Sequence, residues 1–183
     1  RLNQFEVQYQ PQYSAQGSAT GLEALLRWRH PVRGLVPPSI FLSVAEESNI
    51  IVPLGLWSIR ATCEQMALWR TDPLLNHLPV SVNVSAKQLQ QPDFAEQLES
   101  ILAHTGINPA LLILELPCSA LQPAHPDLTR MLSRLSAMGV RLSLDNFGAK
   151  SSSQDMLTQL PLFQVKLSQT LVQRLGPNSA SEA

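Results

Sequence analysis

Alternation of apolar and polar residues marks several stretches of the chain as β-strands. Residues 5–12, "FEVQYQPQ", alternate in this way, and Pro11 is expected to end the strand. A second strand is expected over about residues 20–28, and Val80, Val82 and Val84 alternate in a third. The stretches "ALLILEL", "VRLSLDNFG" and "LPLFQVKLS" predict three more, which gives about six strands.

Segments with the periodicity of amphipathic helices lie between these predicted strands. Apolar residues recur at helical spacing after Pro37 and Pro38, from about residue 54 to 69, and in two later stretches that stop at Gly106 and Gly139. Strands that alternate with helices predict parallel βαβ units, in either a barrel or a doubly wound sheet. A closed (β/α)₈ barrel needs eight strands and about 250 residues, so a barrel would be incomplete in this chain.

Composition narrows the class of protein. The chain has 183 residues, is 44% hydrophobic and carries a formal net charge of −1, which is typical of a soluble globular domain. It has neither an apolar run long enough for a membrane helix nor a signal-peptide pattern. Two distant cysteines predict no disulfide and favour a cytoplasmic domain, whose parent protein could still be membrane-anchored. The small net charge argues against a nucleic-acid polymer as partner.

A polar residue lies in or near the end of each of five apolar strands: Glu23, Asn83, Glu115, Asp145 and Lys166. The C-terminal ends of parallel strands meet on one face, where ligand-binding and catalytic groups gather. Carboxylates that meet there repel one another unless a cation neutralises them. Carboxylate and amide oxygens suit Mg²⁺ or Mn²⁺ better than zinc. A single Asp or Glu at a strand end is more often a helix cap or a surface charge, Asn83 alone would be a turn former, and Lys166 alone would be a solvated charge. Five such residues in corresponding places nevertheless favour a metal site that acts on a phosphate.

An ordered series of motifs resembles the EAL domain family, named for the tripeptide that is Glu23-Ala24-Leu25 here. The series is "YQPQ", "EALLRWRHP", "GLVPPSIFLSVAEES", "VSVNVSAKQL", "LILEL", "GVRLSLDNFG" and "LPLFQVKLS". The resemblance implies a TIM-like α/β barrel with an antiparallel first strand. Residues 1–183 would then be a single EAL domain in which the C-terminal part of the barrel is missing or not covered.

The resemblance also implies a chemistry. Active members of the family are phosphodiesterases that linearise cyclic di-GMP to pGpG with two Mg²⁺ or Mn²⁺ ions. Glu23, Asn83, Glu115 and Asp145 match the ligands of the first metal, and Lys166 matches a lysine that helps to position the attacking water. Glu23 and Lys166 are therefore the expected catalytic residues.

Three further residues match the parts of the family that contact the nucleotide. Arg27 matches an arginine that contacts a substrate phosphate, while Gln10 and Pro38 fall in segments that approach the bases. Cyclic di-GMP is thus the expected ligand. The resemblance also allows a homodimer and an upstream sensor or diguanylate-cyclase-like domain.

The sequence departs from the family around the second metal. Asn146 stands where active members have an aspartate, so as a ligand it brings no negative charge. Cys118 replaces a glutamate that braces the neighbouring loop, Ser168 replaces the aspartate of Lys-Ile-Asp, and residues 149–153 differ from the usual Thr-Gly-Tyr-Ser-Ser. The family's later Glu-Gly-Val-Glu motif would lie beyond Ala183. One metal site is expected to be intact and the second impaired.

Three functions follow from these matches and departures. The favoured hypothesis is a degenerate domain that binds cyclic di-GMP as a receptor or regulatory module with little or no hydrolysis. The alternative is an active phosphodiesterase, since Glu23, Asn83, Glu115, Asp145 and Lys166 are all present. The third is a protein-interaction scaffold without nucleotide binding. Cys118 itself could be a redox switch or a small apolar residue in the core, and the second is favoured.

Overall fold

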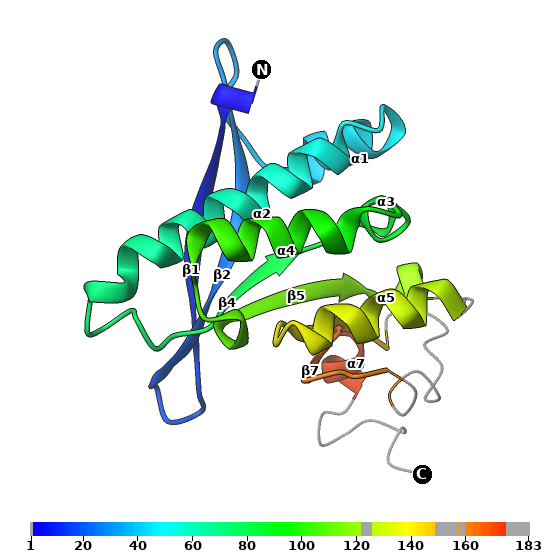
Figure 1. The fold of residues 1–183 in the computed structure, drawn as a ribbon. Coiled ribbons are helices and arrows are strands. Elements are labelled where there is room, and N and C mark those ends of the chain that lie inside the picture. The colour runs from blue at the N-terminus through cyan, green and yellow to red at the C-terminus, as the bar shows by residue number, and fades with distance from the viewer. Residues whose placement is uncertain (1, 122–125, 149–156, 158–159, 175–183) are drawn as a thin grey trace.

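The computed structural model describes residues 2–121, 126–148, 157 and 160–174, and its described strands form one sheet (Figure 1). In spatial order the strands are β1 (Phe5–Tyr13), β2 (Ala19–His30), β4 (Val80–Asn83), β5 (Leu112–Pro117), β6 (Arg141–Phe147) and β7 (Gln164–Leu167). The short β3 (Gly34–Val36) also pairs with β2. The first strand is antiparallel to β2, whereas β2, β4, β5, β6 and β7 run parallel. The predicted α/β fold with an antiparallel first strand is confirmed.

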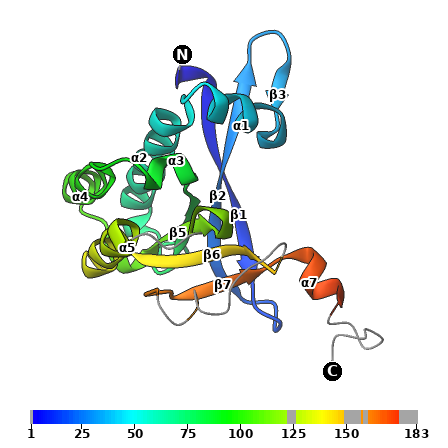
Figure 2. The same ribbon diagram turned by 90° about the vertical axis from the view of Figure 1, so that its right-hand side faces the viewer.

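The helices are α1 (Pro38–Glu47), α2 (Ile51–Leu68), α3 (Ala86–Leu89), α4 (Phe94–Thr105), α5 (Pro126–Ala137) and α7 (Gln169–Arg174). Short 3₁₀ turns occur at Leu2–Gln4, Trp69–Thr71, Pro109–Leu111 and Cys118–Leu121. Helices α2, α4 and α5 cover one side of the sheet (Figure 2). None of the described helices is long and apolar enough to cross a membrane.

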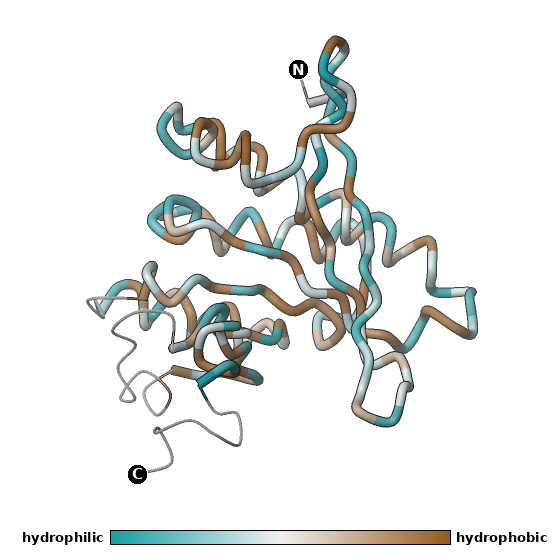
Figure 3. The backbone as a smooth tube through the Cα atoms, turned by 180° about the vertical axis from the view of Figure 1, so that it is seen from behind, coloured by the Kyte–Doolittle hydropathy of each residue, from teal (hydrophilic) through white to brown (hydrophobic). Residues whose placement is uncertain are grey.

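Alternation along the strands decides which side chains meet the helices. Leu22 and Ala24 of β2 and Val80 and Val82 of β4 face the helices in the main core, as do alternate residues of β5 and β6. Figure 3 shows hydrophobic segments along these central strands. Glu23 lies between Leu22 and Ala24, so it projects from the opposite face of the sheet.

A second, smaller core holds α1 in place. Phe41 and Ala45 of α1 are buried with Val36, Ile51 and Leu54, and Phe5, Trp28 and Trp57 pack against them. The rings of Phe5 and Trp28 stack with centroids 5.8 Å apart. The helix α1 and the β2–β3 hairpin therefore have a hydrophobic cluster separate from the one beneath the central strands.

Two local predictions were wrong. The first strand does not end at Pro11 but continues to Tyr13, because β1 is an edge strand and a proline there removes no hydrogen bond from the middle of the sheet. No strand was predicted between about residue 28 and Pro37, yet Gly34–Val36 pairs with β2 as β3. The described sheet therefore has seven strands, where about six were expected.

Candidate functional site

The sheet register brings four of the predicted residues together. Glu23 pairs with Ser81 across β2 and β4, and Asn83 pairs with Glu115 across β4 and β5. The Asn83 amide donates a hydrogen bond from Nδ2 to Oε1 of Glu23, at 3.3 Å. These two side chains come from strands 60 residues apart in sequence, and their contact confirms that the strand ends converge.

Lys166 joins two of the carboxylates. Its Nζ atom donates a hydrogen bond to Oε2 of Glu23, at 2.9 Å, and also forms an ion pair with Oε1 of Glu115. Glu115 is almost fully buried, with a side chain that is 1% exposed, whereas Glu23 and Lys166 are about a quarter exposed. The ammonium group thus compensates a carboxylate that water does not reach.

Burial and charge shift the pKa values of this pair. Burial raises the pKa of the Glu115 carboxyl above its ordinary value and the charge of Glu23 adds to this, although the contacts with Lys166 and Ser81 act in the opposite direction. Burial also acts to lower the pKa of Lys166, but its hydrogen bonds to Glu115 and Glu23 outweigh that effect and raise it. Lys166 is therefore a firmly charged ammonium group at neutral pH.

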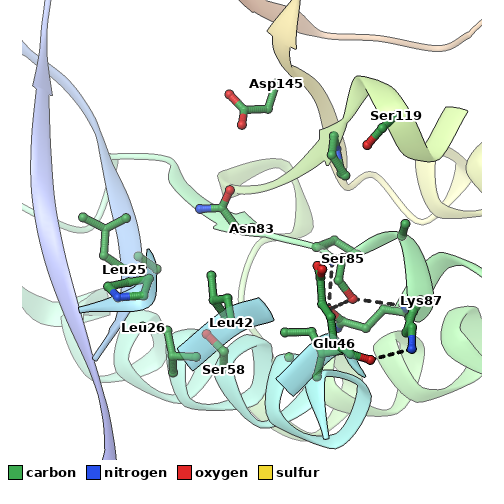
Figure 4. A pocket seen from close by; sticks show the side chains of 18 of the residues that line it. Leu25, Leu26, Leu42, Glu46, Ser58, Asn83, Ser85, Lys87, Ser119 and Asp145 are labelled. Atoms are coloured by element: carbon green, nitrogen blue, oxygen red, sulfur yellow. Dashed lines mark hydrogen bonds between the residues drawn. The ribbon is translucent and has the colours of Figure 1, made fainter. Parts of the chain in front are cut away.

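Asp145 lies on the next strand, beyond this cluster. It pairs with Pro117 across β5 and β6, and within the described residues it makes no hydrogen bond or ion pair with Glu23, Asn83 or Glu115. Asp145 and Asn83 nevertheless line the same pocket, and the amide oxygen of Asn83 is turned toward Asp145 (Figure 4). The prediction that Asp145 belongs to this region fits its position, but its part in a shared ligand set stays a prediction.

The backbone bends at Asn146. This residue has a φ of 60°, in the left-handed region that asparagine and aspartate tolerate better than most residues. The register between β6 and β7 shifts between Leu144 and Phe147, so Asn146 lies in an irregularity of the ladder. Its side chain is exposed. Its role as a metal ligand stays a prediction.

Ser168 and Cys118 have structural roles here. The Ser168 side chain, 3% exposed, accepts a hydrogen bond at 3.1 Å from the backbone N–H of Leu171 and so caps α7. Cys118 is partly buried against the main core. Burial raises the pKa of its thiol, and the nearby charge of Asp145 raises it further. A thiol with a raised pKa is poorly suited to redox signalling, which supports the packing interpretation of Cys118.

A cavity of about 700 Å³ opens beside Asn83, the member of the cluster that lines it (Figure 4). Its wall combines Pro38 and Leu42 of α1, Gly55 and Ser58 of α2, and a longer set from the strand ends and α3: Ala24, Leu25, Leu26, Asn83–Gln88, Pro117, Ser119 and Asp145. This size and the mixture of apolar walls with a few polar groups are typical of a small-molecule site.

The three residues predicted to contact the nucleotide occupy different positions relative to the cavity. Pro38 is the first residue of α1 and lines the cavity. Gln10 pairs with Glu23 across β1 and β2, which puts it next to the cluster, with an exposed side chain. Arg27 lies farther along β2 and donates a hydrogen bond at 3.0 Å to its neighbour's carbonyl, that of Leu26. Their roles toward a nucleotide stay predictions.

The contribution of α2 and α3 to the cavity was not predicted from the sequence. Ser85 and Gln88 form a reciprocal capping box at the start of α3, and Gln88 is buried against α2. The spacing of a serine and a glutamine three residues later could have revealed this cap. Gly55 could not have been found in this way, because only the fold brings it against Gln88.

The donor chemistry of the cluster fits a hard divalent cation. Glu23 and Glu115 supply carboxylates, and the Asn83 amide lies in contact with one of them. Among the described histidine, cysteine, aspartate and glutamate side chains, no group of three is arranged to hold a metal by itself. A cation bound here would therefore need the amide oxygen of Asn83, or water, in addition to the acidic groups.

The fold and this site define an α/β protein whose acidic and amide side chains meet at the C-terminal ends of parallel strands. Comparison with known sequences identifies the family: the protein-family model described as "EAL domain" matches residues 1–183. The chain belongs to the EAL domain family.

Several relatives carry informative names. The chain is 37% identical over 182 residues to the bifunctional diguanylate cyclase/cyclic di-GMP phosphodiesterase MucR of Pseudomonas aeruginosa, and the match covers 98% of this chain and 26% of the relative. It is 35% identical over 181 residues to the cyclic di-GMP phosphodiesterase PdeR of Escherichia coli, covering 99% of this chain and 27% of that protein. The chain thus spans about a quarter of the length of these curated relatives.

Solved structures agree with the fold. The structure described as "PaMucR Phosphodiesterase, c-di-GMP complex" superposes with a TM-score of 0.88 at 34% identity, covering 96% of this chain and 71% of that one. The EAL enzyme Bd1971 in its cGMP-bound form superposes with a TM-score of 0.84 at 27% identity, covering 96% and 49%. The prediction of a TIM-like fold of the EAL type is confirmed, and the described strands form an open part of such a barrel.

Proposed function

We propose that this domain binds cyclic di-GMP in the cavity beside Glu23 and Asn83, and acts as a receptor with little or no hydrolysis. The observation that carries the proposal is the cluster of Glu23, Asn83, Glu115 and Lys166 at the edge of a cavity of about 700 Å³. The MucR phosphodiesterase, a relative of the same fold, has been solved with cyclic di-GMP.

Different residues of the site would bind the metal, orient its ligands and bury the nucleobase. Glu23, Asn83 and Glu115 would hold one Mg²⁺ or Mn²⁺ ion, and a bound dication of this kind neutralises phosphate charge and activates water. Lys166 orients both carboxylates through its two contacts. The apolar wall of the cavity, which includes Pro38 and Leu42, would bury the nucleobase away from water.

Limited hydrolysis is expected from the residues that would hold or support a second metal. Asn146 brings no charge, Ser168 is committed to capping α7, and Cys118 packs against the core. A two-metal displacement needs both ions to stabilise the attacking and leaving oxygens. Losing one would slow the chemistry by several orders of magnitude while contacts to the bases persist. A divalent cation at the remaining site would then serve mainly to bind the phosphate.

The second candidate function is an active phosphodiesterase that hydrolyses cyclic di-GMP to pGpG. It is favoured by the intact contacts among Glu23, Asn83, Glu115 and Lys166. The relatives also include proteins with cyclase or sensor names, so an upstream domain that activates this one fits the same proposal.

One experiment separates the two candidates. Cyclic di-GMP is titrated into the protein by calorimetry in Mg²⁺ and in Mn²⁺, and pGpG is measured by chromatography over the same period. The receptor function predicts saturable binding with little or no pGpG. Rapid formation of pGpG would favour the enzyme, and absence of binding in both metals would exclude both candidates in favour of a scaffold.

A further inference from the structure

A lysine that is not among the proposed metal ligands connects two walls of the cavity. Lys87, in α3, donates hydrogen bonds from Nζ to the backbone carbonyl of Glu46 and, at 2.6 Å, to Oδ1 of Asn49. Glu46 lies in the last turn of α1 and Asn49 lies just after that helix, both about 40 residues earlier in the chain than Lys87. Figure 4 shows the Lys87 side chain extended toward Glu46 at the edge of the cavity.

The end of α1 needs a cation from elsewhere. A helix C-terminus carries partial negative charge, and α1 adds Glu46 and Glu47 there with no basic residue in its last turn. The Ser48 hydroxyl donates a hydrogen bond to the carbonyl of Val44. The carbonyl of Glu46 accepts hydrogen bonds from the N–H of Asn49 and from Nζ of Lys87. The ammonium group of Lys87 therefore supplies the charge that the sequence of α1 lacks.

The backbone conformation of Asn49 allows its side chain to accept the hydrogen bond from Lys87. Its φ of 59° lies in the left-handed region, where asparagine is among the better tolerated residues. The turn between α1 and α2 thereby presents the side-chain carbonyl of Asn49 to Lys87. Two acceptors, one from the backbone and one from a side chain, fix the position of the ammonium group.

The helix that carries Lys87 is itself firmly placed. Gln88 accepts hydrogen bonds from the N–H and hydroxyl of Ser85, and the Gln88 amide lies so close to Gly55 that a Cβ there would be 2.1 Å from Oε1. Helix α3 begins at Ala86, and only Val84 and Ser85 separate it from Asn83 at the end of β4. Lys87 thus joins α1 to a rigid support that continues into the proposed metal-binding strand.

The contact of Lys87 with Glu46 and Asn49 links the two hydrophobic cores. Helix α1 belongs to the smaller core, whereas Val84 and Leu89, on either side of Lys87, belong to the main core. The cavity lies between the two, with Pro38 and Leu42 on one wall and Asn83 and Ser85 on the other. Taking the proposed function as given, we propose that Lys87 is a positioning residue that holds α1 against α3 and so sets the width of the cavity for a cyclic dinucleotide.

The test compares Lys87→Met with Lys87→Arg and with Arg130→Met, which removes an exposed positive charge from α5. Lys87→Met should weaken cyclic di-GMP binding about tenfold, because small displacements of a binding wall are costly, while Mn²⁺ affinity stays within twofold. Lys87→Arg should restore nucleotide affinity to within about threefold, and Arg130→Met should leave it unchanged. Asn49→Gly, which keeps the positive φ but removes Oδ1, should produce part of the loss.

Hydrogen exchange without nucleotide gives an independent readout. Lys87→Met should lose amide protection in residues 44–52 and keep it in α4 and α5. Unchanged protection there, unchanged nucleotide affinity, or an equal loss in Arg130→Met would overturn the inference. If the unmodified domain does not bind cyclic di-GMP, the proposed function fails and the role in cavity width falls with it. Selective loss of protection would then still establish that Lys87 anchors α1.

Discussion

Oε2 of Glu23, in β2, lies 2.9 Å from Nζ of Lys166, in β7, although 143 residues separate the two along the chain. Three strands, β4, β5 and β6, lie between β2 and β7 in the sheet. In a flat sheet that separation would be about 19 Å, from a spacing of roughly 4.8 Å between strands. The contact therefore shows that the sheet curls strongly, as the wall of a barrel does, and that its inner face gathers the polar side chains.

Replacing Asn146 with aspartate should improve catalysis more than binding. The left-handed backbone at Asn146 also tolerates aspartate, so Asn146→Asp should fold normally. It restores a negative charge for a second cation, and pGpG formation should rise by at least about tenfold while cyclic di-GMP affinity stays within about twofold. Steady-state assays and calorimetry measure the two effects. A wild-type rate already equal to that of Asn146→Asp would contradict the idea of an impaired second site.

Ser168 should contribute to stability through the cap of α7. Ser168→Ala removes the acceptor of the Leu171 N–H and should lower the free energy of unfolding by about 1 kcal/mol. Ser168→Asp keeps a capping oxygen and should remain near the wild-type value. Urea denaturation of the three proteins measures this difference. Equal stability of the alanine and aspartate variants would show that the hydrogen bond has no net effect.

The two cysteines should react slowly with alkylating reagents. Burial raises the pKa of the Cys63 thiol to about 12, and burial followed by the charge of Asp145 raises that of Cys118. Because the thiolate is the reactive form, a raised pKa moves the rise in reactivity to higher pH. Iodoacetamide labelling followed by mass spectrometry should therefore find Cys118 slower than glutathione at pH 8 and Cys63 unmodified. Asp145→Asn should speed the reaction of Cys118.

Fast labelling of Cys118 near pH 7 would contradict this account and revive the redox switch. The comparison must be made in the folded protein, because unfolding would expose both thiols. Circular dichroism on the labelled sample provides that control.

Gly55 should be required for the placement of Gln88. A methyl group at this position would overlap the Gln88 amide, so Gly55→Ala should destabilise the domain by about 1–3 kcal/mol. Adding Gln88→Ala makes room for the methyl group, so the double variant should lose less than the sum of the two single losses. Thermal or urea unfolding of the wild type, the two single variants and the double variant measures this double-mutant cycle. Additive losses would show that the two residues do not interact.

Sequence patterns predicted the long elements and the four-residue strands β4 and β7, but they missed β3 and α3. Strands β2 and β6 and helices α2, α4 and α5 each extend over enough residues to show a period, and β5 was predicted from its nearly continuous apolar run. The three residues of β3 and the four of α3 show no such pattern, and their positions depend on pairing with β2 and packing against α2. The proline in β1 misled the prediction because edge position cannot be read from local sequence.

The same limit applies to the site. Glu23, Asn83 and Glu115 could be placed together because parallel strands end on one face. That Lys166 would bridge two carboxylates depends on how far the sheet curls, which no local pattern records. The link from Lys87 to Asn49 likewise depends on a left-handed residue in the turn after α1.

The most direct test of the central claim is the equilibrium binding of Mn²⁺ to the wild-type domain and to Glu23→Gln. The substitution keeps the shape of the side chain and leaves Lys166 paired with Glu115, so the fold should persist. We predict at least a 100-fold loss of Mn²⁺ affinity, with no change in Glu99→Gln, which alters an exposed carboxylate of α4. Equal Mn²⁺ binding by the wild type and Glu23→Gln would contradict the claim that these strand ends hold a cation.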